Sequence, residues 1–303
     1  MRFGVNRGAV GDRSPRRQRA IAAPSATARL GGALYETARG SNAHGAGHAP
    51  RPRHGLPSLR PRRRGPTVCF VHGSGGSKDV WKAQARLSDR FPVAALDLSG
   101  HGDSDDIDVS VGRDALDAYA DDAAAVAEET GATVLCGNSL GGAVALWVAL
   151  ERDLALDRLV LAGTGAKLAV SEPLRDALAT DFDRAIELLH EPDRLFHDAP
   201  PEYVELSRAG MRACGRAVTE RDFRTCHAFD VRDRLGEIGV PSLAVVGEHD
   251  ALTPVEYHDY LADRIGDCER ATIEGAAHLA MLERPAAFNA ALTAFCSRIS
   301  ERS

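Results

Sequence analysis

TVLCGNSLGGAVALWVALE, residues 133–151, is the stretch of sequence that decides the fold. It begins with a short apolar run, passes through the glycine-flanked segment GNSLG, and continues with residues that are apolar on every side. A short apolar run, a tight glycine turn and an apolar helical stretch are typical of a buried parallel strand that leads directly into a buried helix. The stretch therefore predicts a strand, turn and helix at the centre of an α/β domain.

Similar apolar runs surround this unit, and most are followed by a glycine-rich turn and a helical stretch. This alternation predicts a mostly parallel sheet with helices on both faces. The predicted strands are residues 67–72, 93–98, 133–138, 156–162, 242–247 and 269–273. Residues 163–239 carry no strand pattern and read as helices, including 172–189, interrupted by Pro192, Pro200 and Pro201. We therefore expect a helical lid, about residues 165–238, inserted between consecutive strands.

Ser139 lies at the centre of the motif Gly137-Asn138-Ser139-Leu140-Gly141, a G-x-S-x-G between a strand and a helix. A nucleophile on so tight a turn adopts positive φ, and this is tolerated only where the neighbouring residues are small. Gly137 and Gly141 provide that space. The N-terminus of the following helix also directs positive potential at the serine. The motif predicts that Ser139 is a catalytic nucleophile.

A serine hydroxyl needs a base to remove its proton and a carboxylate to orient that base. Asp250 follows the strand-like SLAVVGEH, and His278 lies in the loop GAAHLAML, which gives the chain order expected for this motif. We predict His278 as the general base and Asp250 as its acid. Glu248 is the rival acid, and His249 adjoins it. His190, His197 and His227 belong to the predicted lid and have weaker claims.

The tetrahedral intermediate of acyl transfer needs two hydrogen-bond donors where the oxyanion forms. The backbone N–H of Leu140, directly after the nucleophile, is one predicted donor. The other is predicted at Ser74 in the loop HGSGG, whose glycines allow a close approach of the backbone. A phosphate-binding loop is the weaker interpretation of HGSGG, because no G-x-x-x-x-G-K-[ST] is present and Lys78 is misplaced for one.

Taken together, these motifs resemble the α/β-hydrolase superfamily. The resemblance covers about residues 67–298 and includes the strand followed by HG-x, the segment DLSGHGDS at 97–104, GNSLGG, GEHD and GAAH. In that family the segment at 97–104 forms a structural turn, so the resemblance implies no catalytic role for His101. Family members also place a β-hairpin before the HG strand, where this chain has an arginine-rich segment. The departure puts the first two strands of the family's sheet in doubt here.

The serine at this position argues against haloalkane dehalogenases and epoxide hydrolases, relatives that use an aspartate there. We therefore expect hydrolysis of a small carboxylic ester or related acyl substrate through an acyl-enzyme. Three fragments are similar to the meta-cleavage C–C hydrolases, namely HGSGG followed by Trp81, GNSLGG and Phe288-Asn289. Leu279, however, stands where many of those enzymes carry Trp. Lactonases and cofactor-free perhydrolases share the triad, and a non-catalytic small-molecule-binding protein on the same fold is a further alternative.

Apolar side chains of the predicted lid indicate a mostly apolar pocket for this substrate. They are Phe182, Leu188, Leu189, Phe196, Tyr203, Met211 and Phe223.

Residues 1–66 differ in composition from the rest of the 303-residue chain. They hold 14 arginines, no lysine and two acidic residues, a net charge of +12, without a sustained period of 2 or 3.6. Such a segment buries too little apolar surface to offset the entropy of ordering. We expect it to be disordered or a non-native extension, and the hydrolase domain to span residues 67–303. Binding of anions by this basic segment is the alternative.

The remainder carries 23 basic and 41 acidic residues, a net charge of −18. An acidic body repels nucleic acid and anionic membrane surfaces, so neither is an expected partner. Lysine occurs only at Lys78, Lys82 and Lys167. Adaptation to a salt-rich cytoplasm and the codon bias of a GC-rich genome explain this composition equally well.

The six cysteines show no metal-binding spacing, which indicates a reduced, cytoplasmic setting. No apolar stretch approaches the roughly 18 residues of a spanning helix. We expect no cofactor and no metal, and the oligomeric state is left open by the sequence.

Overall fold

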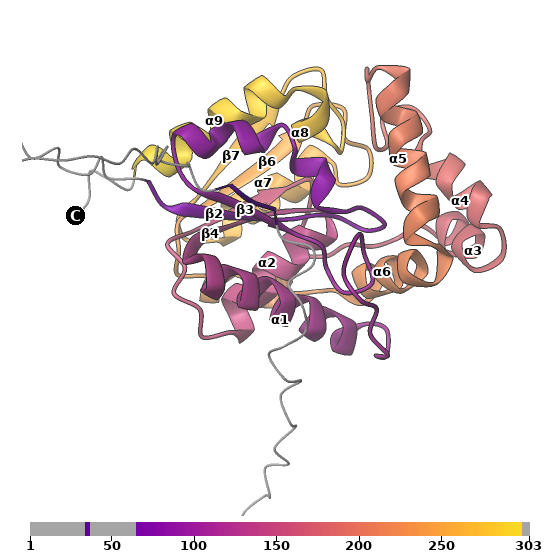
Figure 1. Cartoon of the computed structure of the whole chain (residues 1–303), viewed down its shortest axis with the longest axis horizontal. Helices are drawn as coiled ribbons and strands as arrows, with labels where there is room; N and C mark the ends of the chain where they lie inside the picture. The colour runs from indigo at the N-terminus through magenta and orange to yellow at the C-terminus, as the bar shows by residue number, and fades with distance from the viewer. Residues whose placement is uncertain (1–33, 37–64, 299–303) are drawn as a thin grey trace, which may run out of the picture. The chain divides into compact units, whose positions relative to one another are not determined.

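The computed structural model describes residues 34–36 and 65–298, and these residues contain a seven-stranded sheet (Figure 1). Its spatial order is β1-β3-β2-β4-β5-β6-β7. Strands β2 to β7 pair in parallel, and β1 pairs antiparallel with β3. The strands are β1 (Leu34–Glu36), β2 (Thr67–Val71), β3 (Val93–Leu96), β4 (Ala132–Asn138), β5 (Arg158–Ala162), β6 (Ser242–Gly247) and β7 (Cys268–Ile273).

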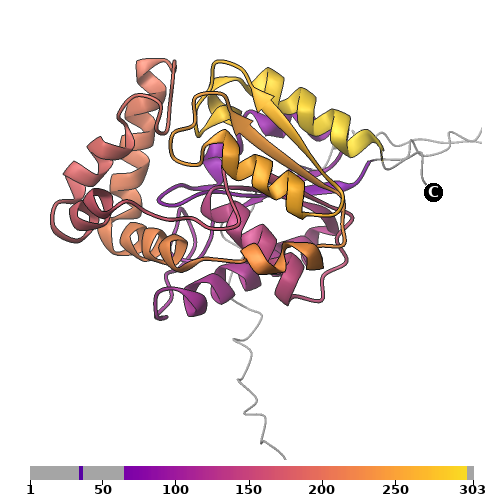
Figure 2. The ribbon, with the colours of Figure 1, turned by 180° about the vertical axis from the view of Figure 1, so that it is seen from behind.

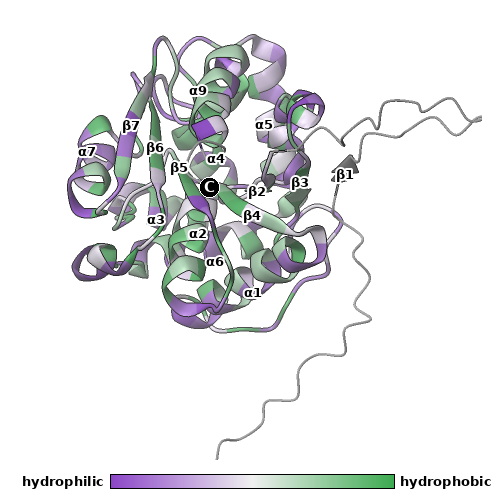
Figure 3. Ribbon diagram, turned by 90° about the vertical axis from the view of Figure 1, so that its left-hand side faces the viewer, coloured by the Kyte–Doolittle hydropathy of each residue, from purple (hydrophilic) through white to green (hydrophobic). Residues whose placement is uncertain are grey.

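The predicted fold class is confirmed: the sheet is mostly parallel, and all six predicted strands are present with ends that differ by two residues or fewer. Strands β3, β5 and β6 are buried along their whole length, as strands covered on both faces must be. The edge strand β7 is mostly half-buried or exposed. Figure 3 shows the same difference in hydropathy, with green prominent in the central strands and more purple in β7.

Strand β1 corrects the expectation that residues 1–66 lack regular structure. Leu34, Tyr35 and Glu36 pair with Ala95, Ala94 and Val93 of β3. Without β1, β3 would present an unpaired edge, and an open edge recruits whatever strand is available. The pairing arises from this tertiary contact, since three residues carry no periodic pattern of their own. Apart from β1, Gly65 and Pro66, the segment 1–66 lies outside the described residues.

Helices cover both faces of the sheet, and each face has its own apolar core. On one face lie α1 (Arg113–Thr130), α2 (Leu140–Glu151) and α7 (Val255–Arg264), packed against side chains such as Leu135. On the other lie η1 (Lys78–Trp81), η2 (Gln84–Asp89), α8 (Ala280–Glu283) and α9 (Pro285–Ser297), packed against side chains such as Val134 and Cys136. Successive residues of β4 thus serve opposite cores, as the period of two requires.

The chain between β5 and β6 is helical, as predicted for residues 165–238. It contains α3 (Glu172–Thr180), α4 (Phe182–Leu189), α5 (Pro201–Cys214), α6 (Arg216–Ala228) and η3 (Arg232–Glu237). Pro201 begins α5, where its missing N–H costs no helical hydrogen bond, so this proline starts a helix as well as interrupting the pattern. Figures 1 and 2 both show α3, α4 and α5 gathered beyond one end of the sheet. Within the described residues, none of the helices is both long and apolar enough to cross a membrane.

Candidate active site

Ser139 occupies the turn between β4 and α2, with φ 55° and ψ −116°. Positive φ in a residue other than glycine costs roughly 1–3 kcal/mol and persists only where the surroundings enforce it. Here the backbone N–H of Ser139 donates to Ala162 O at 2.9 Å, and Ser139 O accepts from Thr164 Oγ1 at 2.8 Å. The N–H groups of Gly142 and Ala143 donate to the same carbonyl. The turn is therefore fixed from both sides of the strained residue.

The two glycines flanking Ser139 are required by close backbone approaches. A Cβ at Gly137 would lie 2.0 Å from the carbonyl oxygen of Gly141. A Cβ at Gly141 would lie 2.2 Å from the carbonyl oxygen of Val71 at the end of β2. Real Cβ atoms do not approach so closely, so the motif serves the turn as predicted.

Asp250 and His278 form a hydrogen-bonded pair in loops at the ends of β6 and β7. Asp250 Oδ2 lies 2.9 Å from His278 Nδ1, and both side chains are buried. Asp250 Oδ1 accepts from the N–H groups of Leu252 and Thr253, and Oδ2 accepts from Thr253 Oγ1 at 2.8 Å. Burial raises the pKa of Asp250, but His278 and the Thr253 hydrogen bonds together outweigh it and lower the pKa below its usual value. Asp250 is thus held as an anion beside the imidazole.

The backbone of His278 is held by two parts of the chain. Asn138 Nδ2 donates to His278 O at 3.3 Å and to Ala162 O at 3.2 Å. His278 N donates to Arg194 O at 3.3 Å, in the segment between α4 and α5. The strand that carries Ser139 and the helical insertion therefore both position the histidine.

The loop after β2 lies against Ser139. A Cβ at Gly73 would be 3.1 Å from Ser139 Cβ, closer than most Cβ contacts, so the loop approaches Ser139 tightly at this glycine. Ser74 lies beyond Gly73, with its Oγ 3.7 Å from Cys226 Sγ on α6. Leu140 is the first residue of α2, so its N–H has no acceptor within that helix. Leu140 thus adjoins Ser139 in the chain, and Ser74 follows a glycine that lies against Ser139.

Ser74, Ser139 and His278 line one cavity of about 940 Å³ between the sheet end and the insertion. Of the predicted pocket residues, Leu189, Tyr203, Met211 and Phe223 line it. Phe182, Leu188 and Phe196 instead belong to or pack against the apolar core on the α9 side. Those three corrections arise because apolar side chains of the insertion pack against the core as well as around the cavity. Lys82, Arg86 and Arg194 add positive charge to the lining.

The rival residues have other partners. Glu248 Oε2 accepts from Gly275 N at 3.0 Å and lies 3.6 Å from His249 Nε2. His190 contacts Ile186 O and Ser207 Oγ. The remaining histidines of the insertion also have partners outside the proposed triad. His197 contacts Asp193, and His227 accepts a hydrogen bond from Val170 N.

Three further residues support this site and were not predicted from the sequence. Besides Thr253 and Thr164, His258 on α7 accepts from Thr164 N through Nε2 at 3.1 Å. Burial lowers the pKa of His258 to about 4, which keeps the ring neutral and able to accept. Thr253 follows Asp250 by three residues, a spacing typical of a side chain-capped turn, and this could have indicated its role. No local signal marks Thr164 or His258, because their partners are distant in the sequence.

A second buried polar group lies beside the loop after β2. Asp222 on α6 accepts from Tyr119 Oη at 2.7 Å, His101 Nε2 at 2.8 Å and Gly75 N at 3.0 Å. The other ring nitrogen of His101 faces Ser99 O at 3.1 Å. Since both His101 nitrogens face acceptors, the ring is an imidazolium. Arg221 donates to Tyr119 Oη and to Asp106.

Comparison with known proteins identifies the family of the chain. The sequence pattern of the Alpha/beta hydrolase family matches residues 70–291, and the chain belongs to this family. The chain is similar to the pimeloyl-[acyl-carrier protein] methyl ester esterase of Neisseria meningitidis serogroup A, at 31% identity over 74% of each protein. It is 25% identical to 3-oxoadipate enol-lactonase 2 of Acinetobacter baylyi over 78% of this chain and 90% of the lactonase. A solved thermophilic esterase matches with TM-score 0.68 and 32% identity, covering 78% of this chain and 91% of the esterase.

These similarities establish the class of protein. The chain is a hydrolase of the alpha/beta hydrolase family, as the motifs predicted.

Proposed function

We propose that the chain hydrolyses a small carboxylic ester through an acyl-enzyme, with Ser139 as nucleophile, His278 as general base and Asp250 as the residue that orients it. The observation that carries the proposal is the buried Asp250–His278 pair, whose histidine lines the same cavity as a serine held at positive φ. Strain at a residue is retained where it serves a function. The esterases and the lactonase among the compared proteins support the same acyl chemistry.

The proposed reaction begins with proton transfer from Ser139. Nδ1 of His278 faces the Asp250 carboxylate and carries the proton there, so Nε2 has the free lone pair. Ser139 Oγ attacks the acyl carbon while Nε2 takes the hydroxyl proton. The N–H groups of Ser74 and Leu140 stabilise the oxyanion. The tetrahedral intermediate collapses, His278 returns the proton to the leaving alkoxide, and water attacks the acyl-enzyme by the same route.

The cavity favours an acyl group that is apolar along much of its length. The insertion contributes Leu174, Leu189, Met211 and Phe223 to the lining. We propose that the insertion acts as a lid, about residues 165–238 of a catalytic domain that spans 67–303, and that residues 1–66 are an extension of this domain that contributes only β1 to its sheet. The chemistry needs no cofactor. We further propose a cytoplasmic setting and small-molecule substrates in place of nucleic acid.

Turnover of p-nitrophenyl acetate and butyrate tests the proposal. Continuous release of nitrophenol is expected. A single stoichiometric burst would instead identify a small-molecule-binding protein on this fold. The same assay with Ser139→Ala should show no release above the uncatalysed rate.

Hydrolysis of a C–C bond is the second candidate, because it uses the same triad. A carbon leaving group must be stabilised as a carbanion, which requires further polar donors around the substrate. Asn138 is one polar group beside Ser139, but its Nδ2 already donates to Ala162 O and His278 O. We therefore expect short acyl esters to have a kcat/KM at least equal to that of any vinylogous diketone. A preference of about a hundredfold for the diketone, roughly 2.7 kcal/mol, would reverse the order of the two candidates.

A further inference from the structure

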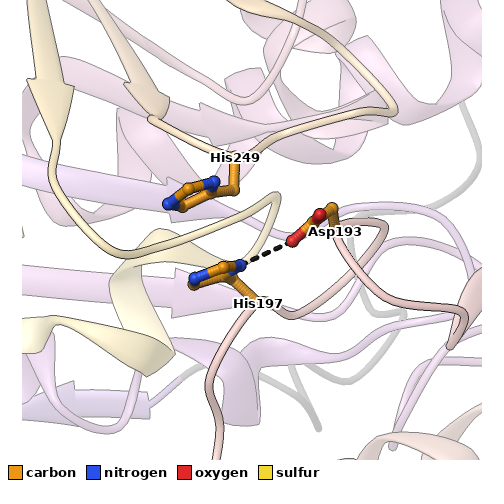
Figure 4. A group of neighbouring side chains, drawn as sticks. All are labelled: Asp193, His197 and His249. Atoms are coloured by element: carbon orange, nitrogen blue, oxygen red, sulfur yellow. Dashed lines mark hydrogen bonds and ion pairs between the residues drawn. The ribbon is translucent and has the colours of Figure 1, made fainter.

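Asp193, His197 and His249 form a cluster outside the cavity, where the insertion meets the core (Figure 4). Asp193 and His197 lie between α4 and α5, and His249 lies in the loop after β6, directly before Asp250. Asp193 Oδ1 is 2.5 Å from His197 Nδ1. The rings of His197 and His249 stack, with centroids 3.6 Å apart and planes inclined by 9°. One ligand atom from each residue falls within 4.8 Å of the others.

The backbone around the cluster is fixed. Asp193 has φ 64°, its N–H donates to Phe196 O at 3.0 Å, and its carbonyl accepts from Ala251 N at 2.8 Å. His249 N donates to Ala276 O at 2.9 Å. Only side-chain rotations therefore separate the three groups from a coordinating arrangement. In a tetrahedral zinc site the ligand atoms lie roughly 2.0–2.2 Å from the ion and about 3.3–3.6 Å from one another. To reach that arrangement, the two stacked imidazole rings must move apart.

We propose that Asp193, His197 and His249 bind a divalent transition metal ion of the Zn²⁺ class, with water completing the coordination. Two neutral imidazoles and a carboxylate are a ligand set that such ions prefer over Mg²⁺ or Ca²⁺. The ion joins the insertion to the loop that carries Asp250. Since none of the three residues lines the cavity, the ion takes no part in the hydrolysis and acts as a cross-link.

Calorimetric titration of the full-length protein with ZnCl₂ tests the site. Because the chain has 11 histidines, the informative quantity is the difference between wild type and His197→Gln or His249→Gln. Each variant should lose one equivalent of Zn²⁺, or bind it at least tenfold more weakly. His227→Gln, which removes an exposed histidine outside the cluster, is the matched control and should titrate like wild type.

Two further measurements keep the result independent of folding and of catalysis. Zn²⁺ should raise the thermal midpoint of wild type and of His227→Gln but not of the cluster variants. Co²⁺ should produce a visible absorption band that Asp193→Asn weakens. Equal Zn²⁺ stoichiometry in wild type and both cluster variants would overturn the proposal, as would wild-type protein that binds no Zn²⁺.

The Asp222 group carries a second and independent inference, which rests on the proposed function. Asp222 is fully buried on α6 of the insertion, yet its Oδ2 accepts the N–H of Gly75, the residue next to Ser74. The charge of His101 compensates the buried carboxylate. The peptide unit that directly follows the proposed Ser74 donor is thus held by a residue 147 positions away in the sequence.

The geometry points to Asp222 as a positioning residue for the oxyanion hole. It touches no substrate and acts through the Gly75 N–H, which fixes the loop after β2 relative to the insertion. Replacing the carboxylate with an amide weakens this charge-assisted hydrogen bond. The loop can then shift, and a small displacement of an oxyanion donor is costly in the transition state.

Asp222→Asn should lower kcat by about tenfold or more with little change in KM, and should weaken binding of a boronic acid transition-state analogue in proportion. Tyr119→Phe is the matched control, because it removes a hydrogen bond to Asp222 Oδ1 and leaves the Gly75 contact. It should lose stability while kcat and boronate affinity stay near wild type. Unchanged kcat in a folded Asp222→Asn, or equal losses in both variants, would overturn the inference. If Ser139→Ala retains activity, the proposed function itself fails.

Discussion

Ser139 has a strained backbone conformation, and its closely packed neighbours hold it in that conformation. The close approaches at Gly137 and Gly141 leave no room for a side chain at either position, and the hydrogen bonds at Ser139 N and O hold the turn in place. At this scale the chemistry depends on one hydroxyl, one imidazole and one carboxylate, and each can be tested separately.

Ser139→Ala should abolish labelling by a fluorophosphonate probe together with ester turnover, because the probe phosphonylates the nucleophilic oxygen. The fold should survive, since alanine keeps the Cβ and the backbone hydrogen bonds. Gel fluorescence after labelling, with circular dichroism as the folding control, measures this. Labelling that persists in Ser139→Ala would assign the nucleophile elsewhere.

Asp250→Asn should leave the protein folded and lower kcat by roughly 10³–10⁴-fold, because the amide no longer favours the productive tautomer of His278. Thr253 and Leu252 can still donate to the remaining carbonyl oxygen. Glu248→Gln is the control and should keep near-normal kcat, since Glu248 contacts Gly275 rather than His278. The reverse pattern in steady-state kinetics would move the acid to Glu248.

The three proposed catalytic residues could be predicted because each lies in a local pattern, a turn or a strand end, that the sequence displays. The residues that hold them in position could not be predicted in this way. Thr164 reaches Ser139 O from 25 residues away, and Asp222 reaches Gly75 from 147 residues away. Hydrogen bonds of this kind depend on how elements pack, which no local period records.

The strands and helices also divide into those that a local sequence pattern predicts and those that tertiary contacts create. Strands β2 to β6 lie in the interior of the sheet, so their sequences are continuous apolar runs and could be predicted with good ends. Strand β1 could not, because pairing with β3 creates it. The insertion was predictable as helical, but which of its apolar residues line the cavity depends on packing against the core.

Two truncations isolate the contribution of β1. Removing residues 1–33 leaves the strand, and removing 1–36 deletes it and opens the edge of β3. We expect the second protein to be less stable by about 1 kcal/mol, since a few edge hydrogen bonds contribute little net free energy. That corresponds to a thermal midpoint roughly 2–4 °C lower. Ester turnover should be the same in both. Equal midpoints would show that β1 adds nothing to the sheet.

His101 links the loop at 97–104 to α6, and its ionisation makes stability depend on pH. Burial lowers the pKa of His101, but the ion pair with Asp222 outweighs it and raises the pKa to about 11. A pKa raised on folding gives stability that is complete below the unfolded value near 6.5. That stability declines as pH rises from there towards 11. Other titratable groups close to the ring are His72, Tyr119, Cys214, Asp106 and Asp122.

The free energy of unfolding, measured in urea between pH 7 and 10, should therefore fall more steeply for wild type than for His101→Gln. Comparing the two slopes removes the contribution of groups that titrate in both proteins. Parallel slopes would mean that His101 is neutral in the folded protein.

The chain after position 66 carries an excess of negative charge. With 41 acidic and 23 basic residues after position 66, 18 carboxylates would stay unmatched even if every base were paired. Many arginines are already engaged in surface ion pairs, such as Arg152 with Asp117 and Asp121. Exposed pairs contribute at most about 1 kcal/mol each, so they do not cancel the repulsion among the remaining acids. Glu128 and Glu129 add to it, because they lie at the C-terminal end of α1, where the helix dipole disfavours negative charge.

Salt should therefore raise stability, and its concentration dependence separates two explanations of the acidic composition. Simple screening is nearly complete by a few hundred millimolar, because the Debye length is already about 8 Å at 0.15 M and about 3 Å at 1 M. If codon bias explains the acids, the free energy of unfolding rises in KCl and then levels off. If the surface is adapted to a salt-rich cytoplasm, stability continues to rise into the molar range.

Glu129→Lys should gain stability at low salt and respond less to KCl, since it removes part of the repulsion that salt would screen. A chain whose stability is the same at 10 mM and 2 M KCl, with Glu129→Lys matching wild type, would show that the excess negative charge does not destabilise the folded protein.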